Sequence, residues 1–224
     1  MKENTIPGWI QDYPQVILEN SNIVPTNIFE IGASNGNDSE FMRNHFNIPP
    51  ENVFCFEPNP SNVQDLTEWH PTFNIFPVAV SDFTGKKIFQ CHIHATDVSS
   101  FRKLLNSNHH YPGLSEQNYI EHEVDVLRMD YIIDHYDIKS IDICKIDVEG
   151  NSYEVLQGFG DKFNIVKFLH IEAEKEVYFD NQPWLFVDVK NFLTEKGYTM
   201  VKYYDIGEAQ CDSWWVRNDV LKTK

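Results

Sequence analysis

The residues best suited to chemistry stand in one short run, Lys145-Ile146-Asp147-Val148-Glu149-Gly150, at the end of an apolar stretch. With the two-residue period of a β-strand, Lys145, Asp147 and Glu149 share one face. A strand buried on both faces should be almost wholly apolar, and buried charges are costly unless they are paired or used. The run therefore predicts a functional site. A Lys145–carboxylate network that merely ties two strands together is the alternative.

A second polar face follows on the next predicted strand, where His170, Glu172 and Glu174 alternate with apolar residues. The carboxyl ends of parallel strands meet at one edge of the sheet, where open α/β folds bind their ligands. Carboxylates gathered there can accept a proton from a substrate. They can also hold a hard divalent cation, so Asp147, Glu172 and Glu174 form a possible Mg²⁺ site.

Upstream, the stretch from Ile28 to Asn37 predicts a buried strand, a turn of small residues and the start of a helix. Gly32 and Gly36 allow the backbone to bend sharply and to approach a ligand closely. Such a unit is where α/β sheets hold nucleotide-like cofactors. An ordinary βα turn that needs glycine only for its geometry is the alternative.

Glu57 ends the second predicted strand, 21 residues after Gly36. A carboxylate in that place can accept hydrogen bonds from both hydroxyls of a ribose. The turn lacks the third glycine of a dinucleotide fingerprint, and Glu30 would oppose a pyrophosphate. S-adenosylmethionine carries cationic groups and no phosphate, so the residues favour methyl transfer. An NAD-dependent oxidoreductase is the alternative enzyme.

The elements that position these residues alternate along the chain, which indicates a doubly wound, mostly parallel sheet. The predicted strands cover residues 27–33, 53–57, 73–80, 141–149 and 166–174, with helices over 38–46, 61–69, 152–159 and 184–196. We expect Asn37 or Asp38 to cap the first of these helices. Strands 86–94 and 121–128 are expected to pair, a helix to cover 129–136, and a hairpin of 199–204 and 213–217 to close the chain.

Domain organisation follows from length and loop composition. A chain of 224 residues suffices for one domain with a sizeable core. We expect a helical lead-in over residues 1–26 and a single catalytic domain over 27–224. We expect residues 95–120 to form a long loop, and such loops are commonly substrate-recognition segments or lids.

Composition narrows the class of partner. The formal charge of −16 repels phosphate backbones, so nucleic acid is not the expected substrate. The chain has no run near the roughly 18 apolar residues of a membrane span, and its start lacks the apolar core of a signal peptide. The four cysteines form no CxxC pair, which favours reduced thiols. We therefore expect a cytoplasmic protein without a membrane span.

The ordered motifs resemble the FkbM family of S-adenosylmethionine-dependent methyltransferases. The resemblance covers residues 27–175 and rests on Phe29-Glu30-Ile31-Gly32-Ala33-Ser34-Asn35-Gly36, Phe56-Glu57-Pro58-Asn59-Pro60, Val78-Ala79-Val80-Ser81-Asp82 with Gly85, and Lys145 to Gly150. Ser99-Ser100 and Leu127-Arg128-Met129-Asp130 also fit. The resemblance implies a class I methyltransferase fold, with a seven-stranded sheet that ends in an antiparallel hairpin. It also implies methylation of hydroxyl groups on sugars or secondary metabolites.

The resemblance also implies a cofactor site. Its methionine portion would be held by Glu30 and by the turn residues Gly32, Ala33, Ser34 and Gly36. Glu57 would bind the ribose, and the adenine would lie among Pro58, Asn59, Ala79, Val80, Ser81 and Asp82. Asp147 would face the amino group or the transferred methyl. Two departures stand out: Glu30 where the family more often has Asp, and Ala33-Ser34-Asn35 where Ala-Asn is usual.

For catalysis we expect Asp147 or Glu172 to act as the base, with Glu149 and Lys145 fixing the geometry. The acceptor would be a small molecule or a glycan, recognised by loop residues that include Arg102, Lys103, Tyr111 and Tyr119. A cofactor-binding domain without catalytic activity is the alternative from outside the enzymes. Two carboxylates after an apolar strand, Asp147 and Glu149, argue against it.

Overall fold

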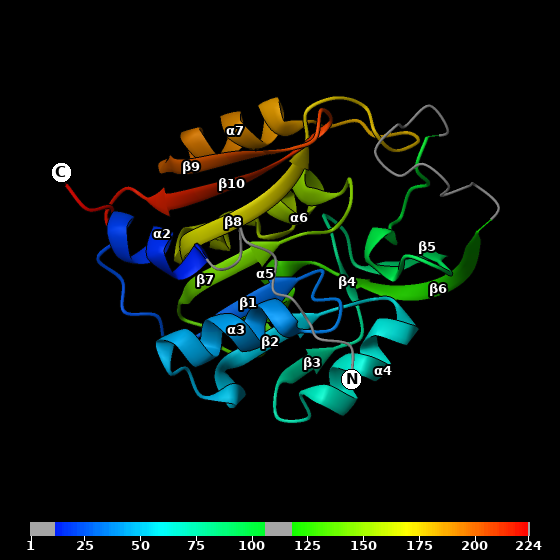
Figure 1. Ribbon diagram of the computed structural model, residues 1–224, viewed down its shortest axis with the longest axis horizontal. Helices are drawn as coiled ribbons and strands as arrows, with labels where there is room; N and C mark the ends of the chain where they lie inside the picture. Colours follow the sequence, from blue (N-terminus) through cyan, green and yellow to red (C-terminus); the bar gives the residue numbers. More distant parts are fainter. Residues whose placement is uncertain (1–11, 106–117, 224) are drawn as a thin grey trace.

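A seven-stranded sheet forms the centre of the computed structural model, which describes residues 12–105 and 118–223 (Figure 1). The strand order is β3-β2-β1-β7-β8-β10-β9. The first five are parallel: β3 (Asn74–Phe76), β2 (Val53–Phe56), β1 (Ile28–Ile31), β7 (Ile141–Ile146) and β8 (Val166–Glu174). The hairpin of β9 (Tyr198–Ile206) and β10 (Gln210–Arg217) joins β8 in antiparallel fashion. This confirms the predicted class I methyltransferase fold.

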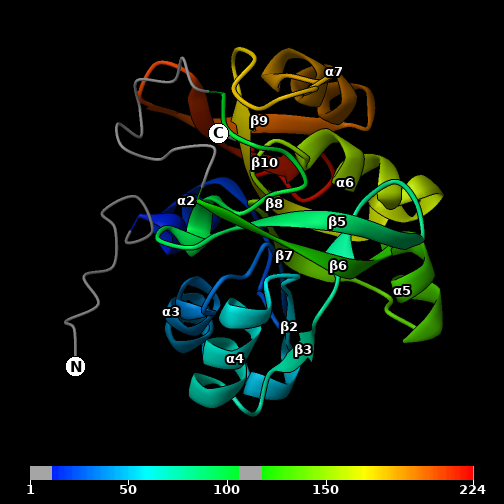
Figure 2. The same cartoon turned by 90° about the vertical axis from the view of Figure 1, so that its right-hand side faces the viewer.

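Two helical layers cover opposite faces of this sheet (Figure 2). One layer holds α2 (Tyr13–Asn20), α3 (Asn37–Phe46) and α4 (Pro60–Trp69), which bury Ile17, Met42 and Leu66 against the strands. The other layer holds α5 (Met129–His135), α6 (Ser152–Gly158) and α7 (Phe186–Glu195), which bury Ile132, Leu156 and Leu193. Strands covered on both faces need apolar side chains on both, which explains the continuous apolar runs of the sequence.

A second, smaller sheet has the order β4-β6-β5. In it β5 (Gly85–His92) and β6 (Tyr119–Leu127) run antiparallel, which confirms the expected pairing, and the short β4 (Ala79–Val80) lies parallel to β6. The residues that the structure describes also include three 3₁₀ turns: η1 (Pro50–Asn52), η2 (Thr96–Val98) and η3 (Gly160–Ile165).

The structure corrects three boundaries. The predicted strand over 73–80 is divided between the two sheets, because Pro77 cannot donate to a strand ladder. Helix α3 is capped by Gly36, which has a φ of 80°, and not by Asn37 or Asp38. The strand predicted over 141–149 ends at Ile146, so the alternation of a strand does not extend to Glu149.

Parts of two predicted segments lie outside the described residues: residues 1–11 of the lead-in, and residues 106–117, with Tyr111, of the long loop. Of the lead-in, α2 packs on the sheet with Tyr13 and Ile17 fully buried. In the described part of the chain, no helix combines the length and apolar character of a membrane span.

Candidate active site

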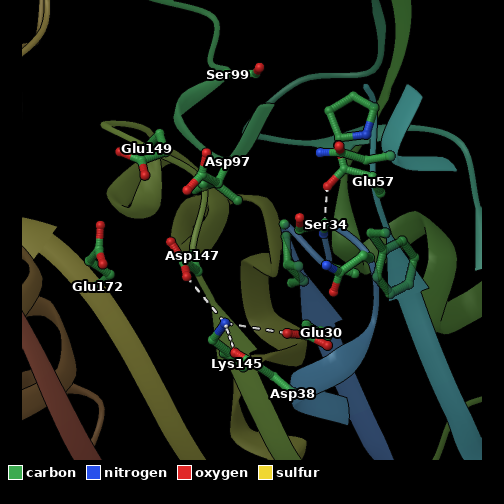
Figure 3. A pocket seen from close by; sticks show the side chains of 18 of the residues that line it. Glu30, Ser34, Asp38, Glu57, Asp97, Ser99, Lys145, Asp147, Glu149 and Glu172 are labelled. Atoms are coloured by element: carbon green, nitrogen blue, oxygen red, sulfur yellow. Dashed lines mark hydrogen bonds and ion pairs between the residues drawn. The ribbon is translucent and has the colours of Figure 1, made fainter. Parts of the chain in front are cut away.

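A cavity of about 720 Å³ opens beyond the carboxyl ends of β1, β2, β7 and β8. Most of the residues predicted to bind or act on ligands line it. They are Glu30, Gly32, Ala33, Ser34, Glu57, Pro58, Ala79, Val80, Lys145, Asp147, Glu149 and Glu172. Figure 3 shows Glu57 and Ser34 on one side of the cavity and Asp147, Glu149 and Glu172 on the other, with Lys145 and its partners below. We call these two sides the cofactor half and the acceptor half of the cavity, after the roles predicted for their residues from the sequence.

In the cofactor half, Glu57 joins the turns that follow β1 and β2. Its Oε2 accepts a hydrogen bond from the backbone N–H of Ser34 at 2.8 Å, and its Oε1 accepts one from the N–H of Asn59 at 2.8 Å. Burial raises the pKa of Glu57 to about 7, although both backbone bonds favour the ionised form. Backbone N–H groups of both turns thus hold the carboxylate in place.

Lys145 lies between three carboxylates at the base of the cavity (Figure 3). Its Nζ is 2.6 Å from Asp38 Oδ2, 3.1 Å from Asp147 Oδ2 and 3.3 Å from Glu30 Oε1, and its side chain is 5% exposed. Burial opposes the charged form, but the three carboxylates outweigh it and raise the pKa of Lys145 well above its usual value. The predicted lysine–carboxylate network therefore exists, and it also lines the cavity.

Glu30 is held from a second side by the start of α3. Its Oε2 accepts hydrogen bonds from the Ser39 hydroxyl at 2.5 Å and from the Ser39 N–H at 3.2 Å. Burial raises the pKa of Glu30 to about 7, and the ammonium of Lys145 opposes that shift. The carboxylate that the sequence places inside an apolar strand therefore has partners on two elements.

The turns after β1 and β7 are in direct contact, which joins the two halves. The N–H of Asp147 donates to the carbonyl of Ile31 at 2.9 Å. A Cβ atom built on Gly32 would lie 1.7 Å from the carbonyl oxygen of Asp147, and Gly32 has a φ of 83°. Only glycine allows this approach. Gly32 is thus required for the close contact between the turns that follow β1 and β7.

In the acceptor half, three carboxylates converge. One oxygen each of Asp147, Glu149 and Glu172 lies within 4.8 Å of the others, and all three residues are half-buried. The amide of Gln210 donates to Glu172 Oε1 at 3.0 Å and, at 3.4 Å, to Glu149 Oε2. Burial, and next the charge of Asp147, raise the pKa of Glu149 and Glu172 well above the usual value. Such a group can take up a proton or hold a hard cation.

The convergence has a different cause from the one expected. Glu149 has a φ of 51° and Gly150 a φ of 79°, so the chain turns tightly after β7. This turn, and not the alternation of a strand, brings the Glu149 carboxylate beside those of Asp147 and Glu172.

The other two polar residues of the β8 face lie elsewhere, which corrects the predicted cation site. Glu174 Oε2 accepts a hydrogen bond from the amide of Gln182 at 2.7 Å, and Glu149 takes its place in the carboxylate group. His170 is buried in the sheet, where its Nε2 lies 2.6 Å from Asp212 Oδ1 and its ring stacks on Trp214. Its position fits a structural residue.

Four residues predicted for the cofactor, Gly36, Asn59, Ser81 and Asp82, are not part of the cavity lining. The Asn59 side chain accepts a hydrogen bond from the Ser61 N–H at 3.1 Å and so caps α4. The Ser81 hydroxyl accepts a hydrogen bond from the amide of Asn151 at 3.2 Å. Asp82 is exposed, and its carbonyl binds Arg128 at 2.6 Å.

Sequence reasoning missed several lining residues, among them Asn62, Phe89, Asp97, Ser99 and Phe101. Most belong to the small sheet and to the segment that follows β5. Phe89 and Phe101 meet edge to face, with ring centroids 5.6 Å apart. The alternation of strand 85–92 indicates which of its side chains are buried. It does not indicate that this buried face lies against the cavity.

The comparisons with known proteins agree with this geometry. Residues 30–200 match the family model of the methyltransferase FkbM domain. A curated relative, 2-O-methyltransferase NoeI of Sinorhizobium fredii (strain NBRC 101917 / NGR234), is 26% identical over 167 residues, which are 70% of this chain and 67% of the relative.

Solved structures show the same fold. The FkbM methyltransferase of Methylobacillus flagellatus KT superimposes with a TM-score of 0.52 at 16% identity, over 85% of this chain and 44% of that chain. This chain therefore spans less than half of that protein. An uncharacterized protein of Listeria monocytogenes serotype 4b gives a TM-score of 0.50 at 11% identity, over 98% of this chain and 71% of the other. With the family model matching most of its length, the chain belongs to the FkbM methyltransferase family.

Proposed function

We propose that the protein is an S-adenosylmethionine-dependent O-methyltransferase that acts on a hydroxyl group of a sugar, a glycan or a secondary metabolite. The observation that carries the proposal is the convergence of Asp147, Glu149 and Glu172 beside the Lys145 network, within one cavity. The catalytic domain would comprise residues 27–224. Residues 95–120 would take part in acceptor recognition.

The carboxylates and apolar side chains of the cofactor half fit a ribosyl cofactor without phosphate. Glu57 is anchored to backbone N–H groups and would accept hydrogen bonds from the ribose hydroxyls. Ala79 and Val80 offer an apolar wall for the adenine ring. Near the turn after β1, the carboxylates of Glu30, Asp38 and Asp147 outnumber the one ammonium of Lys145. Such a surface suits an amino or sulfonium group and opposes a pyrophosphate.

When bound, S-adenosylmethionine supplies a methyl group on a positively charged sulfur. The protein has to align the acceptor oxygen with that methyl group, and alignment accounts for most of the catalysis in such a displacement. The acceptor hydroxyl also loses its proton, which a carboxylate at hydrogen-bond distance can accept. The oxygen would gain the methyl group as the bond between that methyl and the sulfur breaks, S-adenosylhomocysteine would leave as a neutral thioether, and the proton would go to the carboxylate.

Glu172 fits the role of base better than Asp147. Asp147 forms an ion pair with Lys145 at 3.1 Å, so one of its carboxylate oxygens already has a cationic partner. None of the ion pairs among residues 12–105 and 118–223 involves Glu172, and burial raises the pKa of its carboxyl well above the usual value, which suits a proton acceptor. Asp147 would then face the cofactor and the acceptor from the other side, while Glu149 and Lys145 fix the geometry.

A metal-assisted form of the reaction is a second hypothesis. Its ligands would be Asp147, Glu149 and Glu172, since Glu174 faces Gln182. A divalent cation there would lower the pKa of the acceptor hydroxyl and neutralise the gathered carboxylates. Full activity after dialysis against EDTA would exclude it, and activity that returns only with added Mg²⁺ would support it.

Two considerations support a neutral hydroxyl acceptor. The curated relative is a 2-O-methyltransferase by name, and the match covers 67% of the length of that relative. The acceptor half carries carboxylates, which accept hydrogen bonds from sugar hydroxyls and repel phosphorylated compounds. A glycoside is thus a better candidate than a sugar phosphate.

The test has two stages. Calorimetric titration with S-adenosylmethionine should give binding, and titration with NAD⁺ should give none; the reverse result would favour the oxidoreductase. Transfer of labelled methyl groups is then measured on a panel of methyl glycosides of hexoses, 6-deoxyhexoses and N-acetylhexosamines, and on hydroxylated polyketides. Transfer to at least one of them is expected. Cofactor binding without transfer to any would favour a non-catalytic binding domain.

A further inference from the structure

Residues 98–104, which we call the strap, cross the cavity from the small sheet to the turn after β7. The strap begins on the cofactor half: the Ser99 hydroxyl accepts hydrogen bonds from the Asn59 amide at 3.2 Å and from the His92 N–H at 3.0 Å. The backbone of Ser100 pairs with Gln90 of β5. Ser99 and Phe101 line the cavity.

The turn that carries Glu149 is unfavourable by itself. Glu149 and Gly150 both have positive φ values, 51° and 79°, and a residue with a side chain seldom adopts that conformation. Such a backbone persists when its surroundings impose it. The direction of the Glu149 carboxylate therefore depends on what holds the turn.

The strap holds both carbonyl groups of this turn. The Ser100 hydroxyl donates to the carbonyl of Glu149 in a short hydrogen bond, and Arg102 Nη1 donates to the carbonyl of Gly150 at 2.8 Å. These are the carbonyls of the two residues with positive φ. Side chains two positions apart on one extended segment thus fix two successive peptide groups.

Arg102 also ties the turn to the first turn of α6. Its Nη1 donates to Asn151 Oδ1 at 2.9 Å, and its Nη2 lies 2.6 Å from Glu154 Oε1. The side chains of Arg102 and Glu154 are each 10% exposed, so the pair is little weakened by solvent. The planar fork of the guanidinium makes these contacts together, and a lysine ammonium has no equivalent geometry.

The far end of the strap is fixed as well. The Lys103 N–H donates to Asp180 Oδ1 at 2.7 Å, and the Asp180 N–H donates to the Lys103 carbonyl at 2.9 Å. The ring of Phe179 fills the space beside Gly150, where an added Cβ would lie 2.5 Å from it. The turn is therefore enclosed between the strap and residues 179–180.

From these contacts we infer that Ser100 and Arg102 are positioning residues for the acceptor site, which set the orientation of Glu149. The inference rests on the proposed function, because it assigns their effect to the acceptor half of that site. Neither side chain has to touch the acceptor or the cofactor. Removal of either side chain lets the turn rotate, which moves the Glu149 carboxylate away from Asp147 and Glu172. Glu57 and its partners stay in place.

The test compares Ser100→Ala and Arg102→Lys with two matched controls remote from the cavity. Ser21→Ala removes another buried hydroxyl that donates to a backbone carbonyl, that of Ile17 at 2.8 Å. Arg217→Lys removes another guanidinium bound to a carboxylate, Asp219 at 2.6 Å, and to a backbone carbonyl. The acceptor is the methyl glycoside with the highest rate in the panel above.

We expect the KM for the glycoside to rise about tenfold to 100-fold in both strap variants, as for a misplacement near 1 Å. The dissociation constant for S-adenosylmethionine should stay within about twofold, and both controls should resemble the wild type. Glu154→Gln keeps an acceptor oxygen for Arg102 and should change the KM less than Arg102→Lys does. An unchanged glycoside KM, or an equal loss of cofactor affinity, would overturn the inference.

Hydrogen exchange provides a readout that needs no acceptor. Peptides that cover residues 147–152 should exchange faster in the two strap variants than in the controls, while peptides of β1 and β2 keep their protection. Unchanged exchange over 147–152 would overturn the inference even if no glycoside is methylated. If the wild type transfers no methyl group to any acceptor, the proposed function fails and the exchange result still decides whether the strap holds the turn.

Discussion

The two halves of the cavity use carboxylates in opposite ways. In the cofactor half, Glu57 and Glu30 accept hydrogen bonds from backbone N–H groups, a hydroxyl and an ammonium. In the acceptor half, Glu149 and Glu172 lie close to Asp147 and share the amide of Gln210. Burial is the main cause of the raised pKa in all four glutamates. For Glu149 and Glu172 the second cause is the negative charge of Asp147, which raises the pKa further. For Glu30 and Glu57 the second influence is a partner that favours the ionised form.

The difference indicates a division of labour. A carboxylate fixed by N–H donors has a defined direction and suits the recognition of a rigid ligand such as a ribose. Carboxylates that repel one another gain free energy by taking up a proton or a cation. Asp147 belongs to both arrangements, because its Oδ2 pairs with Lys145 and one of its oxygens lies within 4.8 Å of oxygens of Glu149 and Glu172.

The largest effect should follow from removing the base. Glu172→Gln should lower kcat about 100-fold to 10,000-fold, the usual contribution of a general base, while cofactor affinity stays within about threefold. Asp147→Asn should also lower turnover more than cofactor affinity. Single-turnover methyl transfer and calorimetry measure the two quantities.

Glu176→Gln is the control for these variants, because Glu176 is an exposed glutamate just after β8 and does not line the cavity. It should retain turnover near that of the wild type. If Glu172→Gln and Asp147→Asn also retain it, the carboxylates of the acceptor half have no role in proton transfer.

The next largest effect concerns the cofactor half. Glu57→Gln should weaken the binding of S-adenosylmethionine about tenfold to 100-fold, because hydrogen bonds to a charged group contribute roughly 1.5–3 kcal/mol. Glu51→Gln alters an exposed glutamate just before β2 and should bind as the wild type does. Equal affinities of Glu57→Gln and the wild type in calorimetry would remove the ribose role.

A pH series should separate the halves further. Below pH 7 the Glu57 carboxyl, with a pKa of about 7, is mainly protonated and accepts ribose hydrogen bonds poorly. The affinity for adenosine, which lacks the methionine portion, should therefore rise about tenfold between pH 6 and pH 8. Glu57→Gln should abolish this rise. A flat profile in the wild type would show that the Glu57 charge does not matter for the ribose.

The raised pKa of Glu57 also makes the stability of the folded protein depend on pH. The pKa of Glu57 in the folded protein is about 7, above its usual value of 4.5, so the folded state binds the proton more tightly than the unfolded state. This contribution to stability is complete below pH 4.5 and is lost as the pH rises through 7. Thermal unfolding should show a smaller loss over this range for Glu57→Gln than for the wild type. An identical loss would contradict the assignment.

Much of the fold could be predicted from the sequence, because apolar periodicity and glycine turns are local signals. The parallel strands, the closing hairpin and the pairing of β5 with β6 are all of this kind. The arrangement of the site was harder to predict from the sequence. Glu174 faces the amide of Gln182, a partner in a later loop, and Glu149 reaches its neighbours through a left-handed turn. Strand periodicity contains neither kind of information.

The contribution of the small sheet was harder still to predict. Asp97 and Phe101 reach the cavity because the segment after β5 folds back across it, and this depends on contacts such as that of Ser100 with Glu149. Those contacts join residues 49 positions apart. They form between side chain and backbone, where a single sequence carries no periodic signal.

The smallest effect should arise at the rim of the acceptor half. Asp97 is exposed, lines the cavity and is a minor cause of the raised pKa of Glu149. Because exposed charges interact by less than about 1 kcal/mol, Asp97→Asn should change kcat/KM by less than about fivefold. The change should shrink further at high salt. Glu68→Gln, an exposed change on α4, serves as the control for net charge. A loss above tenfold that persists at high salt would mean that Asp97 contacts the acceptor directly. The acceptor half would then include the rim, and its specificity would depend on η2 as well as on the turn after β7.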